Sequence, residues 1–135
     1  MAIGVDGSVC TLRDFFDGDV DGATFRHADH VRIAFEIMRL HNFPDAAQAF
    51  CASLKAIAAR AGNAAAYHET ITLAFLSLVS ERMNATSYTD FVAFSKDNPD
   101  LMDKSVLTRW YDPQRLMSPL ARATFILPEA RGAQP

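Results

Sequence analysis

Cysteine is scarce in this 135-residue chain, which contains only Cys10 and Cys51. The two cysteines do not form a C-x-x-C pair, so they offer no cysteine-based metal knuckle, and one pair is a poor basis for a disulfide scaffold. We therefore expect reduced thiols and a cytoplasmic protein.

Basic clusters and long apolar runs are also missing. The 13 Lys and Arg residues are scattered singly and the net charge is −3, so no surface for nucleic acid or for an anionic membrane is expected. No apolar stretch approaches the length that crosses a bilayer, and the first residues lack the basic and apolar segments of a secretion signal. We expect neither nucleic acid nor a membrane as a partner.

The sequence is rich in hydrophobic residues, at 50% of the chain, and many of them recur with helical spacing. This content suffices for the core of a single domain over 1–135, and no stretch alternates as a half-buried strand does. The predicted fold is therefore all-α: a compact bundle of three main helices, a shorter helix and an irregular helical C-terminal third. We expect loosely ordered ends over 1–9 and 129–135.

The main helices are predicted from 26 or 28 to 41, from 46 to 61 and from about 64 to 83, with the shorter helix at 91–96. Their connections are only a few residues long, so successive helices should be antiparallel and the first and third parallel. The acidic stretch at 17–22 is predicted to be a solvated turn, because it lacks the twelfth-position glutamate of a calcium-binding EF-hand.

Three histidines lie on the apolar faces of the first and third main helices. His27 and His30 fall in the first turn of one helix, and His68 falls in the second turn of the other. Because these helices are expected to be parallel, the three imidazoles should meet at one end of the bundle. His41 lies at the opposite end of its helix and is left out of the site.

A metal site is the first hypothesis for these histidines. Burial and the positive ends of helix dipoles favour neutral imidazoles, which coordinate metals or act as bases. Three protein ligands with an open position are typical of a catalytic zinc, so His27, His30 and His68 predict a divalent metal such as zinc that acts on or senses a small molecule. Glu69, the catalytic candidate, and Asp29 are candidates for a further ligand, an acceptor for a ligating imidazole or a general base.

The same residues also fit a structural interpretation. His27 can cap a helix, and His30 and His68 can bond to each other or to the backbone. Tyr67, Thr70 and Thr72 can then complete a buried polar network that holds no ligand. In that case the protein is a non-enzymatic interaction module or ligand-binding helical module.

The segment 107–127 is the candidate surface for an interaction module, because it is rich in aromatic and apolar residues. Such a segment can leave exposed apolar patches. Those patches would bind a partner or a second copy of the chain, so a homo-oligomer is also among the expectations.

Three motifs stand out: F-x-H-x-D-H-V-R-x-A from Phe25, Y-H-E-T-I-T from Tyr67, and L-x-S-x-x-A-R-x-x-F-x-x-P from Leu116. Together they resemble the pattern of an uncharacterised family of small bacterial helical proteins. The resemblance covers 25–128, and the pairing of the two histidine motifs is its most specific part. It implies a small, bacterial, cytoplasmic helical protein, and it implies no particular reaction, substrate or cofactor.

Overall fold

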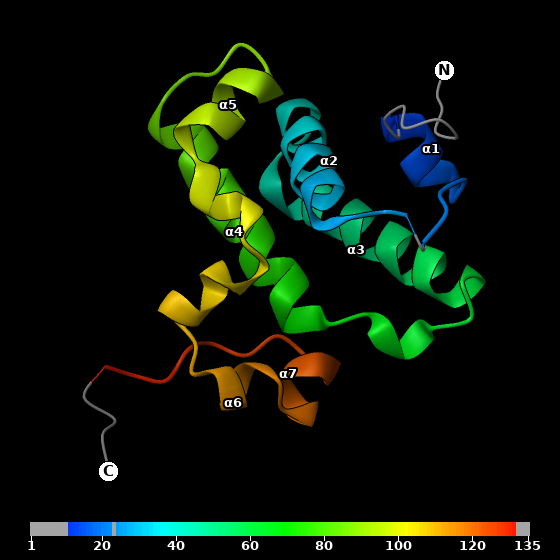
Figure 1. The fold of residues 1–135 in the computed structure, drawn as a ribbon, viewed down its shortest axis with the longest axis vertical. Helices are drawn as coiled ribbons and strands as arrows, with labels where there is room; N and C mark the ends of the chain where they lie inside the picture. The colour runs from blue at the N-terminus through cyan, green and yellow to red at the C-terminus, as the bar shows by residue number, and fades with distance from the viewer. Residues whose placement is uncertain (1–10, 23, 132–135) are drawn as a thin grey trace.

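A computed structural model describes residues 11–22 and 24–131, and these ranges contain helices joined by turns and extended segments but no strand (Figure 1). The all-α prediction is confirmed. Within the same ranges, every helix is too short or too polar to cross a membrane. Cys51 is a free thiol. Cys10, the expected loose end at 1–9 and residues 132–135 of the one expected at 129–135 lie outside the described residues, and residues 129–131 are exposed and outside any helix. The elements in order are α1 (Leu12–Asp17), α2 (His27–Leu40), α3 (Phe43–Arg60), η1 (Ala64–Ala66), α4 (Glu69–Ala85), α5 (Phe91–Asp97), η2 (Pro99–Met102), η3 (Lys104–Arg109), α6 (Pro113–Leu116) and α7 (Pro119–Ala123).

Several helices begin where a short polar side chain caps the first turn. The side-chain oxygens of Thr11, Asn42, Asp90 and Ser118 each accept a hydrogen bond from a backbone N–H three residues on, at 2.9 to 3.1 Å. Such a cap stabilises a helix by about 1 kcal/mol. The cap at Asn42 places the start of α3 at Phe43, three residues before the predicted start.

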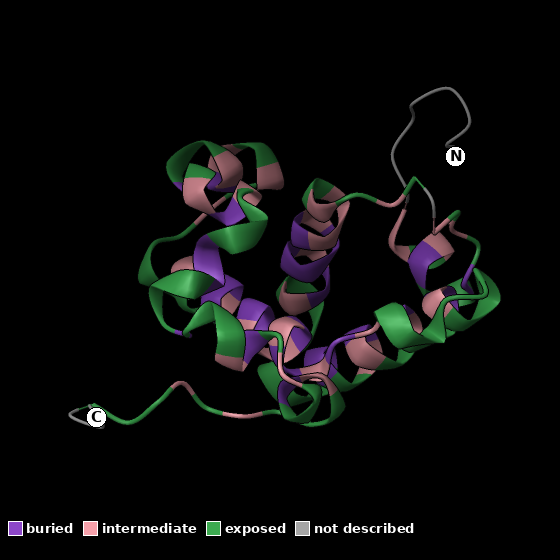
Figure 2. Cartoon of the chain, turned by 60° about the horizontal axis from the view of Figure 1, so that its bottom comes forward, coloured by how far each residue is buried: buried purple, intermediate pink, exposed green. Residues whose placement is uncertain are grey.

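The helices α2, α3 and α4 contact one another pairwise and form most of the core. Burying one large apolar side chain in such a core stabilises the fold by about 1.5–3 kcal/mol. Figure 2 shows the buried positions in purple along these helices. The core residues of α2 are Val31, Ile33, Ala34, Phe35 and Ile37, and those of α4 include Phe75, Leu76, Leu78 and Val79.

The third main helix begins later than predicted. Ala64–Ala66 form a short 3-10 helix, Tyr67 and His68 are extended, and α4 begins at Glu69. His68 is therefore the N-cap residue of α4 and does not lie in a second turn. The physical reason is that its ring accepts a hydrogen bond from the N–H of Ile71, which requires the extended backbone of a capping residue.

The C-terminal third packs along α4, which both η3 and α7 contact. The extended chain after α7 is held by Thr70, a fully buried residue in the first turn of α4. The Thr70 hydroxyl donates to the carbonyl oxygen of Thr124 at 2.7 Å and accepts from the N–H of Ile126 at 3.0 Å. These two bonds fix the extended chain that follows the end of α7 at Ala123 against the start of α4.

Candidate functional site

An open cavity of about 820 Å³ lies where the start of α2, the second half of α3, η1 and the first turns of α4 meet. This volume is in the range that holds drug-sized molecules. The predicted histidines all line this one cavity. Its apolar walls include Phe25, Phe50, Leu54, Ile57, Phe75 and Leu76, and its polar residues are Arg26, His27, His30, Asn63, Tyr67, His68, Thr72, Lys104 and Arg122.

His68 is held by backbone groups at both ring nitrogens. Nδ1 accepts from the N–H of Ile71 at 3.1 Å, and Nε2 donates to the carbonyl oxygen of Leu116 at 2.7 Å. This pattern selects the neutral tautomer with its proton on Nε2. Burial lowers the pKa of the ring, and Thr72 donates to the carbonyl oxygen of His68 at 2.7 Å. His68 thus joins α6 to the start of α4 and keeps no lone pair for a metal.

His27 is the first residue of α2 and is also fixed by the backbone. Its Nε2 lies 2.8 Å from the carbonyl oxygen of Leu101. Because a carbonyl oxygen can only accept, this nitrogen must donate. The ring meets Phe75 edge-on, with 4.9 Å between centroids. The orientation of His27 in the cavity therefore depends on the position of Leu101.

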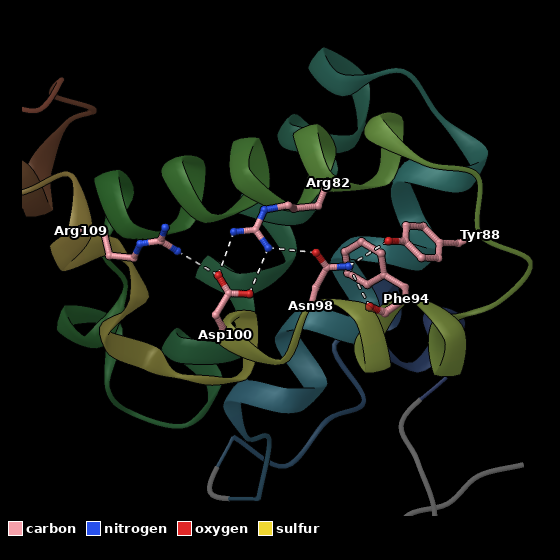
Figure 3. A network of polar contacts seen from close by, with 6 residues as sticks. All are labelled: Arg82, Tyr88, Phe94, Asn98, Asp100 and Arg109. Atoms are coloured by element: carbon pink, nitrogen blue, oxygen red, sulfur yellow. Dashed lines mark hydrogen bonds and ion pairs between the residues drawn. The ribbon is translucent and has the colours of Figure 1, made fainter.

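Leu101 follows Asp100, which lies at the centre of a polar network (Figure 3). Arg82 of α4 donates two hydrogen bonds to the Asp100 carboxylate, at 3.0 and 2.8 Å, and Arg109 donates a third at 3.1 Å. The bond with Arg82 is the main reason that the pKa of Asp100 lies below its usual value. Paired charged bonds of this kind constrain geometry as well as contributing energy. Consequently η2 is fixed to α4, and so is the acceptor of His27. Asn98, Tyr88 and Phe94 complete the network.

The ring of His30 differs from those of the other two histidines because neither of its nitrogens makes a hydrogen bond within the described part of the chain. Its ring packs on Phe25 with 4.5 Å between centroids. Burial lowers its pKa to about 4, the charge of His27 acts in the same direction, and Asp29 opposes both. At neutral pH His30 is therefore a neutral imidazole with one donor and one acceptor available at the cavity.

The structure does not assemble the predicted metal ligands. Among the described residues, no group of three His, Cys, Asp or Glu side chains is placed to hold a metal ion. The prediction set His68 inside a helix with its ring directed at the other imidazoles, whereas the capping position turns the ring to the backbone. The geometry therefore gives no support to a zinc site at His27, His30 and His68.

The two carboxylates proposed to assist a metal take part in local contacts instead. Asp29 accepts the backbone N–H of Arg26 at 2.8 Å and so caps α2. Glu69 accepts the hydroxyl of Tyr67 at 2.7 Å and lies 3.9 Å from the ammonium of Lys55. Burial raises the pKa of the Tyr67 hydroxyl. Neither Asp29 nor Glu69 lines the cavity, so we do not assign Glu69 as a general base.

Sequence reasoning missed the cations at the cavity. Arg26, Lys104 and Arg122 all line it, and no Asp or Glu does so among the described residues. Nη1 of Arg122 donates to the carbonyl oxygens of Ala65 and Tyr67, at 2.8 and 3.3 Å. Arg122 belongs to the third motif, which was the available signal, but a motif does not show which cavity its residues reach. No sequence pattern indicated that Arg26 or Lys104 would line the cavity.

The segment predicted as an interaction surface forms a smaller groove of about 240 Å³ against α4. Trp110, Phe125 and Leu127 line it and are 47%, 41% and 66% exposed. Glu81 is the only charged side chain in the described lining of this groove. A ligand site needs polar groups that orient its ligand, so the larger cavity is the better candidate.

Comparisons with known proteins identify no relative: no protein-family model, curated protein or solved structure matches the chain. The resemblance to small bacterial proteins therefore stays a prediction. The function has to be argued from the cavity and its residues.

Proposed function

We propose that the protein binds a small organic molecule in the 820 Å³ cavity. The observation that best supports this proposal is the neutral imidazole of His30, which has no hydrogen-bond partner among residues 11–22 and 24–131 and lies among apolar walls. Apolar walls bury the body of a ligand, and a few placed polar groups orient it. His30 supplies one donor and one acceptor for that purpose.

The other two predicted histidines support this site through their bonds to backbone carbonyl oxygens. His68 links α6 to α4 through Leu116, and His27 is held by Leu101. Their bonds fix the walls on which ligand binding depends. The proposal thus corresponds to the ligand-binding helical module predicted as an alternative, and on the strength of the family resemblance we extend it to a cytoplasmic bacterial protein.

Binding of a neutral apolar dye tests the proposal. N-phenyl-1-naphthylamine fluoresces strongly in apolar surroundings, and we expect it to bind the wild-type protein saturably with one site per chain. Ala58→Trp fills the cavity, since Ala58 is half-buried and lines it. This variant should weaken binding at least about tenfold, equivalent to about 1.4 kcal/mol.

Ala52→Trp is the matched control, because Ala52 is exposed on the same helix and does not line the cavity. It should leave the affinity unchanged. Equal loss of affinity in both variants, or no saturable binding to the folded wild-type protein, would contradict the proposal. Circular dichroism on each variant establishes that it is folded.

A further inference from the structure

We infer that the ligand of the cavity is an organic anion, a carboxylate attached to an apolar body. This inference rests on the proposed function and concerns the chemical class of the ligand. The charge of the described lining carries it: three cations, Arg26, Lys104 and Arg122, and no carboxylate.

This concentration of positive charge runs against the composition of the chain. The protein has 16 acidic and 13 basic residues, for a net charge of −3. A lining drawn at random from this composition would contain carboxylates as well as cations. Several cations around a concave apolar surface attract an anion more strongly than isolated surface charges do, because the local dielectric constant is lower there.

Arg122 is the best placed of the three cations. It is half-buried, and the carbonyl oxygens of Ala65 and Tyr67 hold its Nη1 in place. Its Nε and Nη2 make no hydrogen bond within the described part of the chain. A guanidinium fixed at one nitrogen presents the remaining donors as a planar fork, which matches the two oxygens of a carboxylate.

The walls indicate an apolar body attached to that carboxylate. Phe50, Leu54 and Phe75 line the cavity, and an inorganic anion would leave this apolar surface in contact with water. The first residues of α2 also line the cavity, and the positive end of the α2 dipole adds to the preference for an anion. His30 then remains available for a second polar group of the ligand.

A matched pair of probes tests the inference on the full chain. 1-Naphthaleneacetate and 1-naphthaleneacetamide share the same aromatic body and differ in charge. Isothermal titration should show at least tenfold tighter binding of the acetate. Inorganic phosphate, tested alone, should bind more weakly than the acetate. Added salt should weaken binding of the acetate and leave binding of the acetamide unchanged.

Variants assign the preference to residues. Arg122→Gln should abolish the difference between the two probes. Because Arg122 also bonds to the backbone, Lys104→Gln provides a second variant. The side chain of Lys104 is exposed and makes no hydrogen bond among the described residues, so this change should leave folding intact and reduce the preference several-fold. Lys96→Gln is the control, since Lys96 is exposed and does not line the cavity.

Each outcome separates this inference from the proposed function. Equal affinity for the two probes, or a preference that neither Arg122→Gln nor Lys104→Gln reduces, would overturn the inference. If neither 1-naphthaleneacetate nor 1-naphthaleneacetamide binds while N-phenyl-1-naphthylamine still does, the inference fails and the proposed function stands. If none of these three probes binds, the inference and the proposed function both fail.

Discussion

Substituting His68 by alanine should lower the free energy of unfolding by about 3 kcal/mol, and a chelator should not change this value. The substitution removes the cap of α4, worth about 1 kcal/mol. It also leaves the carbonyl oxygen of Leu116 without its donor, at a cost of about 1–3 kcal/mol. The residue His68 is only 6% exposed, so loss of its side chain opens a cavity that adds to the cost.

Two further variants separate these contributions in urea unfolding followed by circular dichroism. His68→Asn keeps a side chain that can cap α4 and loses the bond to Leu116, so it should be destabilised by about half as much. His41→Ala changes an exposed residue at the end of α2 and should have little effect. A melting temperature of the wild-type protein that falls on adding EDTA would contradict the structural role of His68 and restore the metal hypothesis.

The second large effect concerns pH. The pKa of His30 is lowered from 6.5 to about 4 in the folded protein, so as the pH falls the unfolded chain takes up this proton first. The stability associated with neutral His30 is therefore fully present above about pH 6.5 and is lost as the pH falls toward 4. Linkage gives a loss of about 2 kcal/mol between pH 7 and pH 4.5 from this group.

His30→Gln should remove that part of the pH dependence. The comparison is best kept at or above pH 4.5. The pKa of carboxylates such as Asp100 is lowered in the folded protein, so their contribution to stability is lost only in more acidic solution, when they are protonated. A smaller dependence of the same sign should remain from His68. His41→Gln is the control for the substitution itself, because His41 is exposed and does not line the cavity. Parallel slopes for the wild-type and His30→Gln proteins would show that His30 is not held neutral.

Much of the helical architecture could be predicted because its signals are local. The apolar spacing of α2 predicted its ends to within a residue or two, and the shorter helix predicted at 91–96 is α5, Phe91–Asp97. The start of α4 was missed for a physical reason. Periodicity shows which face of a helix a residue occupies, but a histidine at a helix start is not a common cap, and Ala64–Ala66 suit a helix equally well.

The candidate site was harder to predict because its polar chemistry comes from distant segments. The sequence indicated that His27, His30 and His68 lie near one another, and all three line one cavity. Their roles depend on the carbonyl groups of Leu101 and Leu116, which come from the irregular part of the chain. No pattern in a sequence indicates which carbonyl oxygen a histidine ring will bond. The sequence therefore could not distinguish His27 and His68, whose rings bond to the backbone, from His30, whose ring is available to a ligand.

The central claim is that His30 faces a ligand site whereas His68 holds the fold together, and imidazole nitrogen NMR tests it directly. The protein labelled with ¹⁵N is titrated with 1-naphthaleneacetate at neutral pH. We expect the ring nitrogens of His30 to shift with saturation, while His68 keeps a neutral Nε2–H tautomer and the exposed His41 does not respond. A His30 ring that stays unchanged at saturation, or a His68 ring that shifts in its place, would contradict the account.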